Sequence, residues 1–340
     1  MIKLVQRDLL SCEAIVRRAP NGELLMVCQC GDVTEPAPGN RVYVWHSKDD
    51  GSSWSKRELL APEDGRAVYQ TEVSVTDGEI RAYLTFHDGR FNKYEHRVYV
   101  SYDSGYTWAD KCGLPLDGFC FIRGMLREGN RQILPYQLYD VPKDVSEKLS
   151  LEKKYIWDAG LDFVRSGTLV SDDGGNTYRR SEREVLLPLK DADGKLKFVW
   201  SEPSVIRLSD GRLAMLLRYD YTGKLYSSYS CDDGVTWSEA KPTDIPNPSN
   251  KVKLLSTGDG GIALIHTPDP VHGMSHRTPL ELWISYDDMK TWQVKKTLWD
   301  IDGWISYPDG FIEGDTGYFS VELNRHDVYF IKTKIPKSSL

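Results

Sequence analysis

The chain carries the octet Ser230-Cys-Asp232-Asp-Gly234-Val-Thr236-Trp237 and close variants of it, five copies in all within 340 residues. The other four copies begin at Ser47, Ser101, Ser171 and Ser285. The copies stand between about 54 and 70 residues apart. A period of this size indicates repeated supersecondary units.

The octet has the composition of a tight turn between two strands. Its Asp carboxylate can accept backbone N–H groups across the turn, its Gly supplies a positive φ, and its Trp can pack onto a neighbouring strand. These are folding devices, so we predict a structural role for the octets and seek catalysis elsewhere.

A second repeat gives the number of units. Each octet is preceded by two apolar runs with a turn between them, and a sixth such pair has no octet after it. Asn-Gly and Asp-Gly between apolar runs are strong hairpin signals. The six turns are Asn21-Gly22, Asp77-Gly78, Gly129-Asn130, Asp210-Gly211, Asp259-Gly260 and Gly314-Asp315.

Each unit holds about four short strands, as in Val205–Leu208, Leu213–Leu217, Leu225–Tyr229 and the segment after Trp237. Long helical periodicity is nearly absent. The sequence therefore predicts an all-β fold, a six-bladed β-propeller of four-stranded antiparallel blades in one domain over 1–340. The last unit is one strand short, and we expect a strand near Lys3–Arg7 to complete it.

An insertion at about 136–162 accounts for the longest spacing between octets. Its charged part, Lys143 to Lys154, is predicted to be either a short surface helix or a loop over one face.

Composition and charge limit the kinds of partner that we expect the chain to bind. A net charge of −7, a pI near 5.6 and the lack of a basic run argue against nucleic acid. No run of 18 apolar residues suggests a membrane span, and the segment from Met1 to Asp8 does not resemble a signal peptide. We expect a soluble monomer, cytoplasmic if the chain is complete and periplasmic or secreted if a leader has been removed.

The six cysteines are scattered rather than arranged as a disulfide framework. Cys28-x-Cys30 has no matching Cys or His pair, and alternate residues on a strand often fill a core. We therefore expect neither a metal nor a cofactor.

Polar residues occupy the ends of predicted inner strands, where propeller sites gather around a central channel. The set comprises Glu202, Arg218, Arg277 and Tyr307, while Arg123 and Glu72 are further residues that could line the channel. These residues also have structural interpretations without a functional role. An arginine at a strand end is often solvated, and a tyrosine before proline often packs against its neighbours.

The chain resembles the sialidase superfamily over essentially its whole length. The octets are similar to the Asp-boxes of that family. Glu202-Pro-Ser-Val-Ile-Arg through to Arg218 resembles the segment with the catalytic glutamate and the second arginine of the carboxylate-binding triad. Arg277-Thr-Pro-Leu-Glu-Leu-Trp-Ile-Ser285 resembles the segment with the third arginine, and Tyr307 stands at the place of the nucleophile.

The resemblance implies a division of roles. Sialic acid carries a carboxylate on its anomeric carbon, which would repel an anionic nucleophile, so a tyrosine hydroxyl attacks and a glutamate takes its proton. Tyr307 and Glu202 would fill these roles. Arg218 and Arg277 would bind the substrate carboxylate by charge-assisted hydrogen bonds.

Two positions depart from the family pattern. Sialidases begin with Tyr-Arg-Ile-Pro, which supplies the first arginine, whereas this chain has Leu10-Ser11-Cys12-Glu13-Ala14 with Ser11 at that place. The family's catalytic acid is an aspartate on the loop before the first box. Here Glu35 is the first candidate for the acid, and Asp32 is the second.

We therefore predict a sialidase-like retaining exo-glycoside hydrolase that acts on a terminal, acidic sugar of a glycan. A glycosidase or polysaccharide lyase with another sugar specificity is one alternative, since fold does not determine chemistry. A non-catalytic glycan-binding propeller is another. A hydroxyl of Tyr307 within reach of Glu202 would favour hydrolysis.

Overall fold

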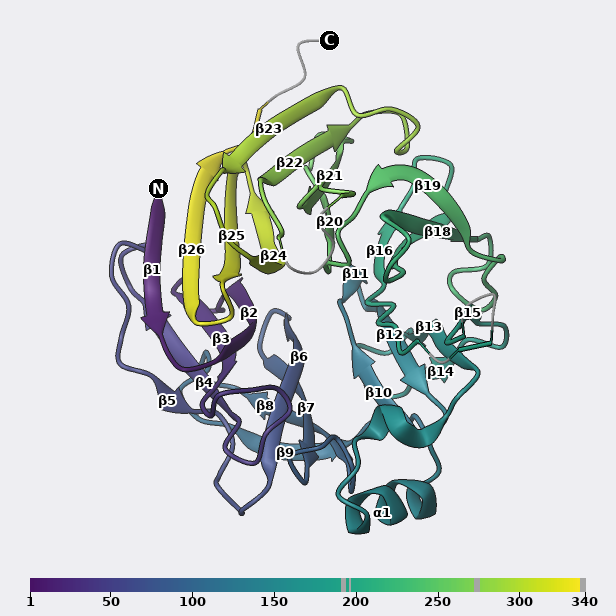
Figure 1. The fold of residues 1–340 in the computed structure, drawn as a ribbon. Helices are drawn as coiled ribbons and strands as arrows, with labels where there is room; N and C mark the ends of the chain where they lie inside the picture. The colour runs from purple at the N-terminus through teal and green to yellow at the C-terminus, as the bar shows by residue number, and fades with distance from the viewer. Residues whose placement is uncertain (191–193, 196, 272–275, 337–340) are drawn as a thin grey trace. The chain divides into compact units, whose positions relative to one another are not determined.

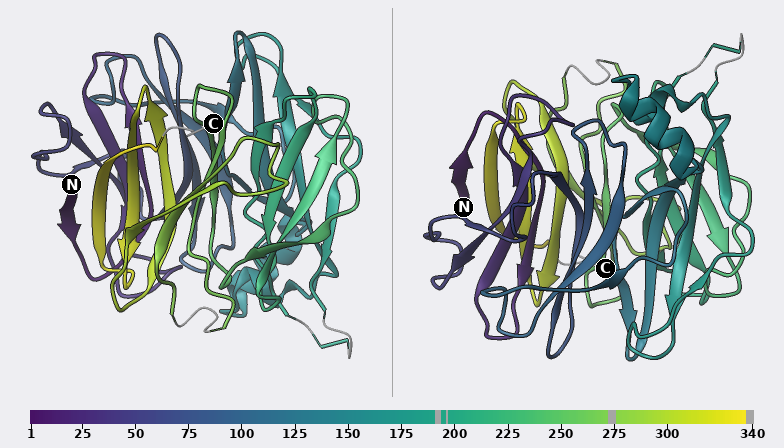
Figure 2. Two further views of the ribbon diagram at one scale, coloured as in Figure 1. Left: turned by 90° about the horizontal axis from the view of Figure 1, so that it is seen from above. Right: turned by 90° about the horizontal axis from the view of Figure 1, so that it is seen from below.

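Strands account for nearly all regular structure in the computed structural model, which describes residues 1–190, 194–195, 197–271 and 276–336 (Figure 1). The strands form six sheets, and Figures 1 and 2 show most of the chain drawn as strand arrows. The fold is an all-β, six-bladed β-propeller with four-stranded antiparallel blades, which confirms the prediction.

The chain divides into two compact units. Unit 1 comprises Met1–Phe121, Tyr139–Leu161 and Phe319–Ile331, and unit 2 comprises Ile122–Leu138, Asp162–Tyr318 and the chain from Lys332 onward. The single domain over 1–340 stays a prediction.

Unit 1 contains two complete sheets, ordered β2-β3-β4-β5 and β6-β7-β8-β9. Ile15, Leu25, Val44, Val73 and Leu84 belong to one buried core that joins the two sheets. The strands are β2 (Ser11–Arg18), β3 (Leu24–Cys30), β4 (Arg41–Ser47), β5 (Glu58–Leu59), β6 (Ala67–Val75), β7 (Ile80–His87), β8 (Glu95–Ser101) and β9 (Ala109–Gly113).

Unit 2 also contains two complete sheets, ordered β16-β17-β18-β19 and β20-β21-β22-β23. Their shared core includes Ile206, Leu216, Leu254 and Leu264. The strands are β16 (Ser204–Arg207), β17 (Leu213–Arg218), β18 (Lys224–Ser230), β19 (Lys241–Pro246), β20 (Lys253–Ser256), β21 (Ile262–His266), β22 (Leu280–Ser285) and β23 (Val294–Trp299).

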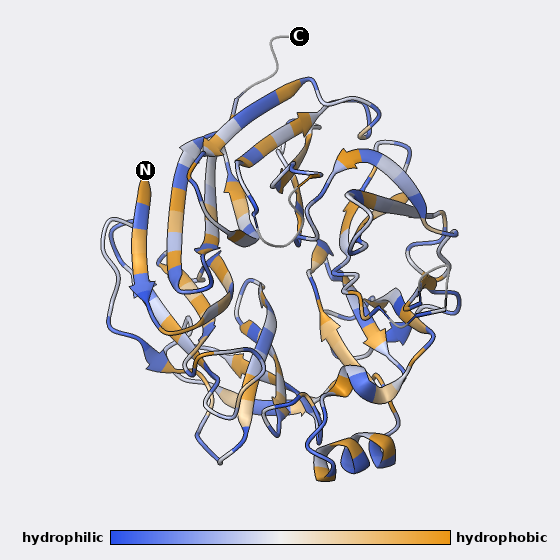
Figure 3. Ribbon diagram, viewed as in Figure 1, coloured by the Kyte–Doolittle hydropathy of each residue, from blue (hydrophilic) through white to orange (hydrophobic). Residues whose placement is uncertain are grey.

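The two remaining sheets differ from these in strand number or in the order of their strands along the chain. One follows the order β10-β12-β13-β14, with β11 added to β12 and β15 to β13. Its first strand, β10, is buried throughout and hydrophobic along its length (Figure 3). The strands are β10 (Phe119–Ile122), β11 (Leu126–Glu128), β12 (Arg131–Tyr139), β13 (Phe163–Ser171), β14 (Arg179–Arg180) and β15 (Val185–Pro188).

The N-terminal strand completes the last sheet, as predicted. That sheet runs β1-β26-β25-β24, with Ile2 opposite Ile331 and Arg7 opposite Asp327. Its strands are β1 (Ile2–Arg7), β24 (Ile305–Glu313), β25 (Thr316–Leu323) and β26 (Asp327–Lys334). All six predicted hairpin turns lie between neighbouring strands of one sheet.

The octets form the predicted turns. In the fourth copy, Asp232 Oδ1 accepts the Thr236 N–H at 2.8 Å and Oδ2 accepts the Thr236 hydroxyl at 2.7 Å, while Ser230 Oγ accepts the Gly234 N–H at 2.8 Å. Equivalent bonds occur in the other copies. In the first copy, hydrogen bonds from Ser53 lower the pKa of Asp49 to about 2.

The fifth octet keeps this turn without its glycine. Met289 stands at the glycine position with a φ of 64°, in the left-handed region where Gly234 has 88°. Its N–H still donates to Ser285 Oγ, at 2.9 Å. The hydrogen bonds of the turn therefore hold a side chain in a conformation that costs free energy outside glycine.

We expect Gly234→Ala to lower the free energy of unfolding more than Gly211→Ala. Both glycines have a φ of +88°, so both substitutions incur about 1–2 kcal/mol of left-handed strain. A Cβ at Gly234 would also collide with Thr168 Oγ1, whereas one at Gly211 would meet no atom within 4 Å. Chemical denaturation should show a further loss of about 1–3 kcal/mol for Gly234→Ala. Equal losses would contradict the packing argument.

The insertion contains a short helix, which was one of the two predicted alternatives. Helix α1 (Lys143–Leu151) is followed by the 3₁₀ helix η1 (Ile156–Ala159). Both pack within unit 1, where Ser146 Oγ of α1 accepts the Lys93 N–H at 3.0 Å and the Ile156 N–H of η1 donates to Arg90 O at 3.1 Å. Across the described ranges, no helix is long and apolar enough to cross a membrane.

Candidate active site

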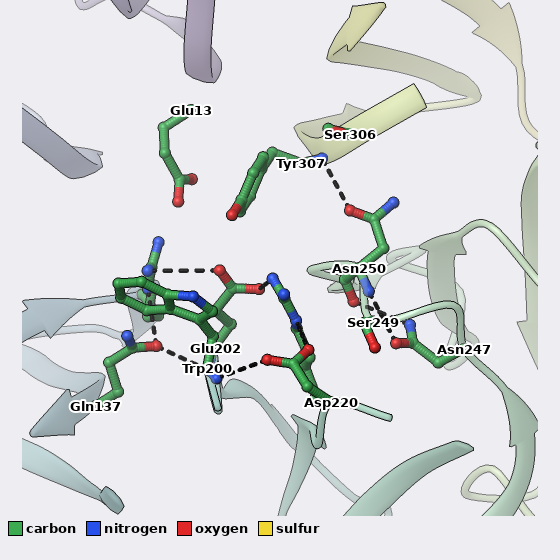
Figure 4. Close-up of polar contacts among 12 residues, drawn as sticks. Glu13, Gln137, Trp200, Glu202, Asp220, Asn247, Ser249, Asn250, Ser306 and Tyr307 are labelled. Atoms are coloured by element: carbon green, nitrogen blue, oxygen red, sulfur yellow. Dashed lines mark hydrogen bonds and ion pairs between the residues drawn. The ribbon is translucent and has the colours of Figure 1, made fainter. Parts of the chain in front are cut away.

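Glu202 is a buried carboxylate just before β16, the first strand of the sheet β16-β17-β18-β19. Its side chain is fully buried, and its backbone N–H donates to Gln137 Oε1 at 2.9 Å (Figure 4). Its φ is 35°, an uncommon value for a residue other than glycine. The backbone at this position is therefore held in a strained conformation by the surrounding structure.

Two arginines surround this carboxylate. Arg218 Nη1 donates to Glu202 Oε2 at 2.9 Å, and Arg123 Nη2 lies 3.6 Å from Oε1. Burial acts to raise the pKa of Glu202, but the charges of Arg218 and Arg123 outweigh it and lower the pKa. Glu202 is thus a carboxylate at neutral pH, in the form that can accept a proton.

Arg218, at the end of β17, is shared between two acidic groups. Its Nε contacts Asp220 Oδ1 and its Nη1 bonds Glu202, while Asp220 Oδ2 accepts the Trp200 N–H at 2.9 Å. Burial raises the pKa of Asp220. Arg218 is 2% exposed, so the pair of carboxylates depends on its charge.

Arg123 joins the same network from the end of β10. Its Nε donates to Gln137 Oε1 at 3.3 Å, the atom that also accepts the Glu202 N–H. Two of the residues that the sequence singled out, Arg123 and Glu202, are therefore linked through Gln137 on β12.

Arg277 has a different environment. Its Nη1 donates to Asn250 Oδ1 at 3.2 Å and Ser306 Oγ at 3.0 Å, and its Nη2 donates to Ser249 O at 2.5 Å. Among the described residues no carboxylate forms an ion pair with it, and its buried Nε has no hydrogen-bond partner. Burial and the charge of Arg218 lower the pKa of Arg277 to about 10.

Tyr307 lies in β24 and has a φ of 50°, so its backbone is strained, as that of Glu202 is. Its N–H donates to Asn250 Oδ1 at 3.2 Å. Figure 4 shows its hydroxyl pointing toward the Glu202 carboxylate. Backbone hydrogen bonds between Arg277 and the Gly303–Ile305 segment hold Arg277 next to the start of β24.

Unit 2 therefore brings together five residues that the sequence predicted, Glu202, Arg218, Arg277, Tyr307 and Arg123. Four others escaped the sequence reasoning: Gln137, Asp220, Asn250 and Lys251. Lys251 Nζ lies 5.9 Å from the centroid of the Tyr307 ring, and its charge also lowers the pKa of Glu202. Asp220 follows Arg218 by two residues, a spacing that could have signalled an acidic partner.

The candidates for the acid lie in unit 1. Glu35 Oε2 contacts Arg325 Nη2 and accepts the Cys12 thiol at 3.0 Å. Asp32 accepts the backbone N–H groups of Val33 at 2.8 Å and Gly39 at 3.0 Å, so it shapes its loop. The role of either residue as acid stays a prediction.

The other residues of interest in unit 1 have local partners. Glu72 Oε1 accepts from Arg17 and from the Val73 N–H. Ser11 is buried, and its hydroxyl donates to His326 O at 2.9 Å. The carboxylate of Glu13 accepts the Tyr69 hydroxyl at 3.1 Å. Glu72 as a channel residue stays a prediction.

Comparisons with known proteins agree with the fold. A family model described as a BNR repeat-like domain matches residues 39–321. The fold is similar to that of the Hadza microbial sialidase Hz136, with a TM-score of 0.74, 15% identity and coverage of 98% of this chain and 68% of that one.

Two further structures are similar. A protein of unknown function from Dyadobacter fermentans has a TM-score of 0.69 and 16% identity, with 98% of this chain and 99% of that one covered. The Trypanosoma rangeli sialidase in complex with sialic acid has a TM-score of 0.68 and 16% identity, with 96% and 54% covered, so this chain spans about half of that enzyme. A comparison with curated protein sequences gave no match.

Proposed function

The chain belongs to the family of BNR repeat-like domains, and on that premise we propose that it is a sialidase-like retaining exo-glycoside hydrolase acting on a terminal acidic sugar. The observation that carries this proposal is the Glu202 carboxylate, buried between two arginines and approached by the Tyr307 hydroxyl (Figure 4).

The proposed reaction has two steps. Tyr307 Oη attacks the anomeric carbon while Glu202 takes the phenol proton, and the bond to the leaving oxygen breaks as an acid protonates that oxygen. Glu35 is the first candidate for this acid and Asp32 the second. Water then attacks the anomeric carbon and gives a proton to the carboxylate that had served as the acid, while the bond from that carbon to Tyr307 Oη breaks and Glu202 returns its proton to the phenol, so the sugar leaves with its configuration retained.

The charges favour an acidic substrate. Arg277 is bound by neutral groups, so its positive charge remains available to a substrate carboxylate. Arg218 is already bound to Glu202 and Asp220. We propose Arg277 as the principal substrate clamp, with Arg218 holding Glu202 in place.

We expect the wild-type protein to release the aryl group from an aryl sialoside or an aryl uronide, and to leave neutral aryl glycosides largely intact. A panel of the three substrate classes, followed by absorbance, tests this expectation. Turnover of a neutral glycoside alone would favour a glycosidase of another specificity, and an unsaturated sugar product would indicate a lyase. Binding of a sugar without turnover of any substrate would favour a glycan-binding propeller.

A further inference from the structure

Asn250 is a fully buried amide in the loop between β19 and β20. Its Nδ2 donates to Thr267 Oγ1 at 3.0 Å and to Ile305 O at 3.1 Å. A carbonyl such as Ile305 O can accept but never donate. These bonds fix the orientation of the amide, and they direct its Oδ1 to the opposite side.

Two residues of the proposed active site donate hydrogen bonds to that oxygen. Asn250 Oδ1 accepts from Arg277 Nη1 at 3.2 Å and from the Tyr307 N–H at 3.2 Å. The loop itself is held by Asn247, which bonds both the N–H and the carbonyl of Asn250 at 2.9 Å. One rigidly held atom therefore positions the proposed clamp and the left-handed backbone of the proposed nucleophile.

The neutrality of this side chain has a chemical consequence. An aspartate at 250 would bind Arg277 more strongly, because charge-assisted hydrogen bonds exceed neutral ones. It would also neutralise the arginine. With Asn250, Ser306 and Ser249 as partners, Arg277 stays positively charged, and its buried Nε lacks a partner within the part of the chain that the structure describes.

We propose that Asn250 is a positioning residue that holds Arg277 without neutralising it, and that it thereby determines the preference for acidic over neutral ligands. This inference rests on the proposed function for its kinetic test. The same residue also positions Tyr307, so its loss affects the chemical step as well as binding.

We expect Asn250→Asp to lower the ratio of kcat/KM for an acidic aryl glycoside to that for its neutral counterpart by tenfold to a hundredfold, on the order of one lost charged hydrogen bond. The loss should fall mainly on KM for the acidic substrate. Asn92→Asp is the matched control, since Asn92 is equally buried, its Nδ2 donates to a backbone carbonyl of unit 1, Lys154 O, and it is not a hydrogen-bond partner of Arg277. A ratio unchanged in Asn250→Asp, or equally reduced in the control, would overturn the inference.

Asn250→Ser is the second variant, and it keeps position 250 neutral. It should lower kcat on both substrates, because Tyr307 loses its acceptor, and it should lower the acid-to-neutral ratio less than Asn250→Asp does, because Arg277 keeps its charge and its bonds to Ser306 and Ser249. If Asn250→Asp fails to fold, a fall of tenfold or more in the acid-to-neutral ratio of the neutral variant Asn250→Ser would contradict the proposal, because the charge of Arg277 is unchanged there.

Calorimetric binding separates this inference from the proposed activity. Wild-type protein should bind free sialic acid more tightly than its methyl ester, and Asn250→Asp should bind the two alike. If the wild type binds with this preference, Asn250→Asp loses it, and the wild type turns over no substrate, the proposed hydrolysis fails and the role of Asn250 stands. If the wild type hydrolyses acidic glycosides and Asn250→Asp keeps the preference, the role of Asn250 fails alone.

Discussion

Tyr307→Phe is expected to lower kcat for an acidic aryl glycoside by at least about 10³-fold with little change in KM. Removing a nucleophile that acts together with its base eliminates most of the chemical acceleration. The ring and its packing remain, so binding through Arg277 should persist. Initial rates over a range of substrate concentrations, together with calorimetric affinity for the free sugar, check both parts of this expectation.

Tyr136→Phe is the matched control for this substitution. Tyr136 is a buried tyrosine whose hydroxyl contacts Glu184, and it lies next to Gln137 on β12. The control should keep the wild-type kcat. A 2,3-difluoro sugar should lose its anomeric fluoride and add the mass of the remaining fluoroglycosyl group to the peptide that contains Tyr307 in the wild type. A Tyr307→Phe variant within tenfold of wild-type kcat would show that another group is the nucleophile.

Arg218→Met should cause the largest loss of stability among the site substitutions, about 3–5 kcal/mol of unfolding free energy at neutral pH. The substitution leaves the buried carboxylates of Glu202 and Asp220 without the cation that they share. Chemical denaturation measures this loss. Arg207→Met on the neighbouring strand β16 is the control, because its ion pairs with Glu128 and Asp233 are partly exposed and should contribute about 0–1 kcal/mol.

The pH dependence of this loss has a defined sign. Burial already raises the pKa of Asp220 in the folded protein, and loss of the Arg218 charge, which lowers that pKa, raises it further, while Glu202 keeps the charges of Arg123 and Lys251. A carboxylate with a raised pKa destabilises the fold above its unfolded pKa, and the penalty shrinks as pH falls and both states become protonated. The difference from wild type should therefore be smaller at pH 5 than at pH 8. Arg218→Met combined with Asp220→Asn should recover part of the stability at pH 8, and a loss below 1 kcal/mol in the single variant would contradict the analysis.

The sequence predicted the fold well because its signals are local. The bonds of the octet at Ser230 span four residues, and the Asp210-Gly211 turn lies within one hairpin, so composition over a short window determines both. The pairing of β1 with β26 is not local, but a unit that lacked one strand allowed its prediction.

The site was predicted less completely because its charge balance depends on contacts between distant segments. Glu202, Arg218, Arg277 and Tyr307 could be selected as polar residues at strand ends and from the resemblance. No sequence pattern around position 250 indicated that its amide would form hydrogen bonds with Arg277 and Tyr307, which are 27 and 57 residues away. Nor did the sequence distinguish Arg218, which two carboxylates hold, from Arg277, which neutral groups hold.

The left-handed backbone at Glu202 and Tyr307 bears on how such a protein would change under selection. At both positions glycine or asparagine would relieve the backbone strain, and what opposes such a replacement is the pairing of Glu202 with Arg218 and Arg123 and the packing of the Tyr307 ring. A lineage that lost its catalytic role could drift toward those residues once that pairing and packing had changed, whereas one that kept it would retain the conformational penalty. The two φ values thus mark where backbone strain and side-chain contacts would compete over evolutionary time.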